Sequence, residues 1–252
     1  MMINITPEIA EICGIHAGDG YLRCREGNKG EVQICGSLEE KEYYNNHVIP
    51  LLNNLFNLSI NGKTFSSTYG FVCYNRLVRE TFLELGFPQG KKSDSVRVPK
   101  IILDSKNKEL FCRFLRGIFD TDGNLSFRKS YAGINKFNIK YNQYPTIRLT
   151  TISKFLAEDI IRMLHELDIL FFYFNHDTKK ENEKRKYLIT ISGIDGLEKW
   201  MELIGMKNPV KLSRYLVWKK FGFCPTNLTL KQREEILNGE LDIYSMSPYV
   251  NG

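Results

Sequence analysis

Two copies of one short motif limit most strongly what this 252-residue chain can fold into. Each copy is a helix-like apolar run that ends in Asp-Gly and continues into an alternating strand: EICGIHAGDGYLRCR at 11–25 and FLRGIFDTDGNLSF at 114–127. Thr6 and Pro7 predict the N-cap and first position of the first helix, and the second helix is predicted from residue 108. We expect the glycine after each aspartate to end its helix by adopting a conformation that is costly for other residues.

The same order of elements follows both motifs, which indicates an internal duplication. Alternating strands, a helix, two more strands and a closing helix are predicted in each half, at 31–35, 37–55, 59–65 and 70–74, and at 146–150, 153–167, 171–175 and 187–192. The closing helices end alike, in LELGFPQGKK and MELIGMKNPVK. The predicted fold class is therefore α+β, with two tandem αββαββα repeats related by pseudo-twofold symmetry and two antiparallel sheets that form a saddle.

These patterns also predict the domain organisation. Residues 1–92 form the first repeat, 93–107 a linker with little periodicity, 108–223 the second repeat, and 224–252 a tail to which we assign no chemistry.

Composition narrows the classes of partner and of cellular environment. The formal net charge is +6 and the pI about 8.9, which suits a nucleic-acid partner. The six cysteines form no pair with zinc-site spacing. No apolar stretch reaches the roughly 20 residues that span a bilayer, and the N-terminus lacks a signal-peptide layout. We expect a soluble intracellular protein without membrane contact, in the cytoplasm or nucleoid, or in an organelle of a eukaryote.

Glycines on the two motif helices predict how the helices meet. Gly14 and Gly18 lie four residues apart, and Gly117 matches Gly14, so each helix offers a smooth side to a second backbone. Such packing brings Asp19 and Asp122 together at the C-terminal helix ends. Acidic side chains there oppose the helix dipole at a cost of about 0.3–1 kcal/mol each. A bound cation would relieve this conflict, and hard oxygen ligands favour Mg²⁺.

The segments ICGIHAGDG and FLRGIFDTDG resemble the two signature motifs of the LAGLIDADG homing endonucleases, in the form that carries both motifs on one chain. The resemblance covers residues 1 to about 223. It implies a site-specific endonuclease that hydrolyses one phosphodiester on each strand of a long DNA target, encoded by a mobile intron and acting as a monomer. The catalytic, metal-binding acids are then Asp19 and Asp122, and the preceding residues, Gly18 and Thr121, are further metal-site candidates.

Family members often place a lysine near each cleavage centre, and this chain offers several. Lys91, Lys92, Lys207 and Lys211 follow the closing helices, and Lys154 follows the second strand of the second half. We select Lys92 and Lys207 as the catalytic candidates, although a solvated surface role is the common fate of any one lysine. Asp120 has Ala17 as its counterpart in the first motif, so a structural role at the helix end is expected for it.

Strand alternation predicts one apolar and one polar face for each sheet. The apolar faces consist of Leu22, Val32 and Ile34, and of Leu125, Ile147 and Leu149. The predicted DNA contacts on the opposite faces are Tyr21, Arg23, Arg25, Gln33, Ser126, Arg128, Arg148 and Thr150. Lys129, Lys136 and Lys140 join them from a basic, aromatic excursion at 128–145. β-ribbons fit the major groove, whereas simple solvation is the default for such faces.

A second class of function is a nucleic-acid-binding protein on the same fold, either an RNA maturase for intron splicing or a transcription regulator. Intron RNA is then a further candidate partner beside double-stranded DNA. Such proteins can lose the metal-binding acids, and both acids are present here. An intein is less expected, because the ends Met-Met and Val-Asn-Gly lack the groups that protein splicing requires.

Overall fold

The computed structural model describes residues 4–24, 30–129, 141–176 and 184–246. The first repeat consists of α1 (Pro7–Asp19), β1 (Gly20–Cys24), β2 (Gly30–Ser37), η1 (Leu38–Glu40), α2 (Lys41–Tyr43), η2 (Tyr44–Val48), α3 (Ile49–Phe56), β3 (Lys63–Phe65), β4 (Thr68–Cys73) and α4 (Arg76–Glu84). The second repeat consists of α6 (Lys108–Asp122), β5 (Asn124–Arg128), β6 (Tyr144–Thr151), α7 (Lys154–Glu166), β7 (Phe172–His176), β8 (Lys186–Ser192) and α8 (Ile194–Leu203). Outside this common pattern lie α5 (Lys100–Ser105), α9 (Pro209–Phe221), α10 (Leu230–Asn238) and η3 (Ile243–Met246).

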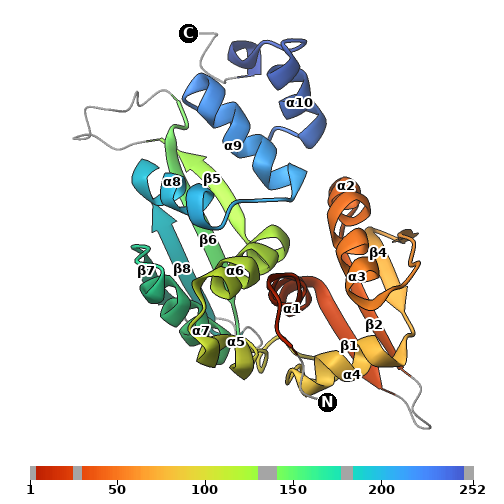
Figure 1. Ribbon diagram of the computed structural model, residues 1–252. Helices are drawn as coiled ribbons and strands as arrows, with labels where there is room; N and C mark the ends of the chain where they lie inside the picture. Colours follow the sequence, from red (N-terminus) through yellow and green to blue (C-terminus); the bar gives the residue numbers. More distant parts are fainter. Residues whose placement is uncertain (1–3, 25–29, 130–140, 177–183, 247–252) are drawn as a thin grey trace.

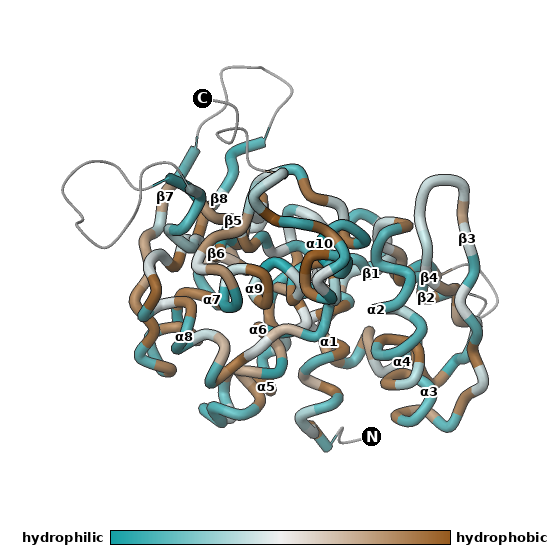
Figure 2. The backbone as a smooth tube through the Cα atoms, turned by 90° about the horizontal axis from the view of Figure 1, so that it is seen from above, coloured by the Kyte–Doolittle hydropathy of each residue, from teal (hydrophilic) through white to brown (hydrophobic). Residues whose placement is uncertain are grey.

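Both sheets are antiparallel, four-stranded and ordered alike, β1-β2-β4-β3 and β5-β6-β8-β7. They lie on opposite sides of the central pair α1 and α6, as both views of the chain show (Figures 1 and 2). This matching order confirms the predicted α+β fold of two tandem repeats.

The apolar strand faces pack under the helices. All six residues predicted for these faces are buried: Leu22, Val32, Ile34, Leu125, Ile147 and Leu149. Helices α7 and α8 contact the second sheet, and α4 contacts the first. Burial of such side chains contributes about 1.5–3 kcal/mol each relative to exposure, so the apolar face fixes which face of each sheet points outward.

The helix predicted over 37–55 is divided. A capping box of Ser37 and Glu40 starts it, and η1, α2, the π-helical η2 and α3 then follow one another. Pro50, in the first turn of α3, has no N–H to donate to the preceding turn. The local shift to wider π spacing fits this missing bond.

The glycines after the two acids do not adopt the expected left-handed conformation. Gly20 (φ −79°, ψ 149°) and Gly123 (φ −75°, ψ 159°) are extended. They are needed for space instead, because a Cβ would lie 2.1 Å from His16 Nδ1 at Gly20 and 2.2 Å from Phe119 Cδ2 at Gly123. After each of the two helices the backbone therefore passes directly into a strand, and the glycine lies tightly against the last helical turn.

The segments predicted as linker and tail are structured in their described parts. Residues 93–107 include α5 and bury Val96, Val98, Ile102 and Leu103, and the tail contributes α10, which packs on α9. The buried Arg233 of α10 donates to Ser213 Oγ at 2.8 Å. The boundaries 1–92, 93–107, 108–223 and 224–252 stay predictions.

Candidate functional site: two carboxylates at the ends of a glycine-packed helix pair

Helices α1 and α6 approach each other at backbone distance. A Cβ on Gly14 would lie 2.1 Å from the carbonyl oxygen of Phe114, and a Cβ on Gly117 would lie 2.3 Å from that of Glu11. Gly18 continues this contact, since its Cβ would lie 2.0 Å from Thr121 Oγ1. The three glycines predicted for the helix interface therefore lie in it, and the C-terminal ends of both helices lie side by side.

Asp19 is held in place by a neighbouring tyrosine. The Tyr44 hydroxyl donates to Asp19 Oδ2 at 2.6 Å, and a Cβ on Gly36 would lie 3.0 Å from the same oxygen. Burial raises the pKa of Asp19 to about 7, and the charges of Asp122 and Glu40 add to this, although the hydrogen bond from Tyr44 opposes it. A cation that binds this carboxylate near neutral pH would displace a proton.

Asp122 has a more open environment. Its side chain is exposed and lines a cleft of about 230 Å³ together with Gly18, Lys92 and Thr151. Partial desolvation raises its pKa, while the charges of Lys92 and Lys211 lower it. The two acids thus occupy matching positions in the repeats but differ in their surroundings.

One buried lysine contacts each helix end. Lys92 Nζ donates to the carbonyl oxygens of Ala17 (2.8 Å) and Gly18 (2.6 Å). Lys211 Nζ donates to those of Phe119, Asp120 and Thr121, at 2.7 Å each. Cations at helix C-termini are favourable because the last carbonyls are unpaired there. Burial lowers the pKa of both ammonium groups, and the nearby acids raise it.

The second predicted lysine, Lys207, lies in a different position from Lys92, and its catalytic role stays a prediction. Lys207 has an exposed side chain, and its backbone N–H donates to Asp120 Oδ2 at 2.8 Å. By its contacts with the helix-end carbonyls, the positional counterpart of Lys92 is Lys211. The sequence offered both lysines within five positions, and only the tertiary placement of α9, from which Lys211 reaches the carbonyls at the end of α6, decides between them.

Polar groups near Asp120 join the two repeats. Asn208 Nδ2 donates to the backbone oxygen of Asp120 and to Glu40 Oε1, at 2.7 Å in both cases. Asp120 is fully buried, and burial raises its pKa to about 6, against the hydrogen bond from Lys207. It faces the start of α9, which fits the structural role expected for it.

The donor set suits a hard cation. Two carboxylates and the carbonyls of Gly18 and Thr121 lie at the adjacent ends of α1 and α6, and oxygen ligands of this kind suit Mg²⁺. Each of these carbonyls already accepts a bond from a lysine but keeps a second lone pair. Among the described residues, no group of three His, Cys, Asp or Glu side chains could hold a metal. Waters or phosphate oxygens would therefore supply the remaining ligands.

The predicted DNA contacts divide by exposure. Tyr21, Arg23, Arg128, Arg148 and Thr150 are exposed, whereas Gln33, Ser126 and Lys129 are half-buried. Arg23 lies opposite Glu31 with 3.7 Å between charged atoms, and Arg128 lies over the Tyr144 ring at 4.7 Å. The positions Arg25, Lys136 and Lys140 lie outside the described residues.

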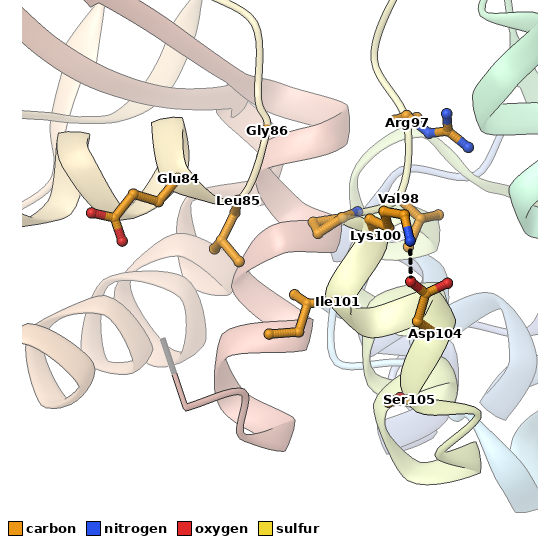
Figure 3. A pocket seen from close by; sticks show the side chains of 10 residues that line it. Glu84, Leu85, Gly86, Arg97, Val98, Lys100, Ile101, Asp104 and Ser105 are labelled. Carbon is orange, nitrogen blue, oxygen red and sulfur yellow. Dashed lines mark hydrogen bonds and ion pairs between the residues drawn. The ribbon is translucent and has the colours of Figure 1, made fainter. Parts of the chain in front are cut away.

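A second cavity, larger than the cleft beside Asp122, is lined by other residues. It measures about 940 Å³ and is lined by the end of α4 and by residues 97–105. Figure 3 shows Glu84 and Leu85 on one side, with Lys100 joined to Asp104 on the other. None of its lining residues is a predicted site residue, and its charges are mixed.

A buried carboxylate ties the helix pair together behind the site. Glu11 accepts bonds from Arg113 (3.1 Å), Arg116 Nε (3.0 Å) and His47 (2.6 Å). Burial would raise the pKa of Glu11, but the hydrogen bonds from His47 and Arg116 outweigh it and hold the pKa at about 2. The group thus contributes stability at neutral pH that is lost as the pH falls from 4.5 through 2.

Glu11→Gln should lower the free energy of unfolding by about 3 kcal/mol at pH 7, because two arginines lose their buried counter-charge. Urea titrations from pH 7 to pH 2 should show the gap to wild type closing below pH 4.5. The control is Glu158→Gln, which removes an exposed i,i+4 pair with Lys154 and should cost at most about 0.5 kcal/mol. A gap that is constant with pH would contradict the ionised network.

Comparisons with known proteins support the fold described above. Residues 109–205 match the family model of the LAGLIDADG-like domain. The homing endonuclease I-DmoI in complex with DNA and Mn has a TM-score of 0.54 at 15% identity, covering 80% of this chain and 98% of that one. A variant of I-SmaMI has a TM-score of 0.52 at 13% identity, covering 99% of each chain.

Two curated relatives come from Methanocaldococcus jannaschii. Replication factor C small subunit is 34% identical over 128 residues, which cover 51% of this chain and 6% of the relative. Glutamine–fructose-6-phosphate aminotransferase is 25% identical over 216 residues, which cover 83% of this chain and 17% of the relative. The chain thus spans a small part of each of these proteins.

The family match thus covers residues 109–205, and the chain shares its fold with the single-chain LAGLIDADG homing endonucleases. The resemblance stated from the two motifs is thereby confirmed. Among the described helices, none is long and apolar enough to cross a membrane.

Proposed function

We propose that this protein is a monomeric, site-specific DNA endonuclease that hydrolyses one phosphodiester on each strand of a long target, as a product of a mobile intron. The observation that carries the proposal is the matched placement of Asp19 and Asp122 at the ends of the glycine-packed helices, each beside a lysine-capped helix end. Carboxylates in this position oppose the helix dipole, so a role in stability does not account for them.

The position of each residue indicates its role in the proposed reaction. Asp19 and Asp122 would hold divalent cations, with Mg²⁺ proposed, and the carbonyls of Gly18 and Thr121 lie beside them. Bound cations of this kind activate water and stabilise the leaving oxygen in phosphodiester hydrolysis. Lys92 and Lys211 fix the two helix ends and place positive charge beside the acids, where a phosphate would lie. The outward faces of the two sheets would bind the DNA grooves on either side.

Tyr44 makes the surroundings of Asp19 differ from those of Asp122. It orients Asp19 through a 2.6 Å hydrogen bond, whereas Asp122 is exposed on the wall of its cleft. Tyr44→Phe should therefore slow cleavage of one strand roughly 10-fold, the lower end of what the loss of a metal-site partner costs, and leave the other strand unchanged. The measurement is nicking of a duplex labelled separately on each strand.

The adjacent Tyr43 offers a matched control. Its hydroxyl is buried with no hydrogen-bond partner among the described residues, so Tyr43→Phe should leave both nicking rates unchanged. Equal slowing of both strands by Tyr44→Phe would show that Tyr44 supports the fold and does not orient Asp19.

The proposed activity is tested directly with a randomised duplex library. The protein and Mg²⁺ are incubated with the library, and the cut ends are sequenced. A single recovered sequence cut on both strands supports the endonuclease. Sequence-specific binding without any cut would instead favour the maturase or transcription-regulator alternative.

A further inference from the structure

The outer strand of the second sheet has an unusual surface. Strand β7 lies at the sheet edge (Figure 1), and all five of its residues are exposed. Phe172 is 59% exposed, Phe174 is 56% exposed, and Leu170 just before the strand is 87% exposed. Its sequence FYFNH has no Lys, Arg, Asp, Glu or Pro, the residues that usually protect an edge strand from unwanted pairing. An unprotected apolar edge indicates a binding surface.

The strand register places both phenylalanines on the outward face of the sheet. Phe172 lies opposite Thr190, which lies opposite Arg148. Phe174 lies opposite Leu188, which lies opposite Thr150. Residues directly opposite in antiparallel strands share a face, so Phe172 and Phe174 extend the face of Arg148 and Thr150. On the other face of the sheet, α7 and α8 pack against β6 and β8.

Charge on this sheet has one sign. Strands β5 to β8 carry Arg128, Arg148 and Lys186 and not a single Asp or Glu. A cationic face with an apolar outer stripe matches the major groove, which presents phosphates along its rims and thymine methyl groups on its floor. The positive charge of this face attracts DNA, which is negatively charged, and repels a second copy of this basic protein. DNA is therefore the favoured partner.

The distance between the two phenylalanine rings indicates how far apart the contacted bases lie. The rings of Phe172 and Phe174 are stacked, with centroids 6.5 Å apart and 21° between their planes. Two base steps along one strand span about 6.8 Å. The two rings can therefore face two bases that are separated by one base pair.

We propose that Phe172 and Phe174 contact two thymine methyl groups, two base pairs apart, in the half of the target bound by strands β5 to β8; this rests on the proposed function. Among the described residues of the first repeat, the edge strand has no equivalent pair. Its edge strand β3 has the sequence KTF, with Lys63 Nζ over the Phe65 ring at 4.9 Å. The thymine preference is thus expected on one side of the target alone.

The experiment begins with binding selection from a randomised duplex library in chelator, so that no strand is cut. Each thymine of the selected duplex is then replaced singly by deoxyuridine, which lacks the methyl group. Two replacements, two base pairs apart, should weaken wild-type binding roughly 3- to 10-fold each. Phe172→Ser and Phe174→Ser should each become insensitive to one of these replacements. Phe155→Ser, on α7 and 51% exposed, is the control and should keep both sensitivities.

The outcomes separate this inference from the proposed function. Wild-type binding that is insensitive to every deoxyuridine, with unchanged affinity of the phenylalanine variants, overturns the inference alone. A wild-type dimer that becomes monomeric in these variants, with the same DNA preference, also overturns it and assigns the stripe to self-association. If wild-type protein selects no sequence at all, the proposed function fails and the inference with it.

Discussion

Asp19→Asn and Asp122→Asn proteins are expected to bind the target duplex as wild type does and to lose double-strand cleavage, with at least one strand cut about 100-fold more slowly or worse. Asparagine keeps the shape of the side chain, and its oxygen can still accept the Tyr44 hydrogen bond. It cannot supply the negative charge that a divalent cation requires, and loss of one such electrostatic group commonly costs about 10²–10³ in rate.

The measurement pairs a binding assay with a strand-resolved cleavage assay in Mg²⁺. Asp104→Asn serves as the control, since this exposed carboxylate pairs with Lys100 on α5 and should change neither readout. Cleavage of both strands at the wild-type rate by either site variant would show that the two aspartates are not the metal-binding acids.

Gly14→Ala and Gly117→Ala are expected to destabilise the protein by more than about 4 kcal/mol, beyond the usual cost of overpacking. The added methyl group would lie 2.1 or 2.3 Å from a backbone carbonyl oxygen of the facing helix. A backbone carbonyl cannot rotate away as a side chain can, so the two helices must separate. Urea unfolding at neutral pH measures the loss.

Gly196→Ala is the matched control for these variants. It also places a methyl group in a helix, but the contact is with the Ile191 Cγ2 methyl at 2.8 Å and not with backbone, so the expected cost is that of ordinary overpacking, about 1–3 kcal/mol. Alanine also favours a helix interior over glycine by about 1 kcal/mol. A similar loss in all three variants would mean that the close approach of α1 and α6 is not the cause.

Most of the fold was accessible from the sequence because apolar periodicity and the repeat agree with each other. The αββαββα order, the start of α1 at Pro7 and the buried strand faces are all local patterns. The division of the helix over 37–55 and the helix α5 in the predicted linker were not foreseen. Both depend on how a short segment packs against the rest of the chain, which local pattern does not report.

Fewer features of the candidate site could be predicted from local sequence patterns. Ser37 and Glu40 form a capping box that the sequence could have revealed, but Tyr44 and Asn208 carried no local signal. Tyr44 is 25 residues from Asp19 in sequence, and Asn208 is 168 residues from Glu40. Such partners are found only when distant elements are placed in space.

The sequence alone determined that two like helices end in Asp19 and Asp122 and that glycines allow those helices to meet, because both features repeat within short segments. Tertiary structure decided which lysine lies at the second helix end, that Tyr44 holds one of the two acids, and that β7 turns two phenylalanines to the outward face. The physical reason is that a hydrogen bond or an exposed face depends on the final position of elements far apart in the chain, and residue order does not fix that position.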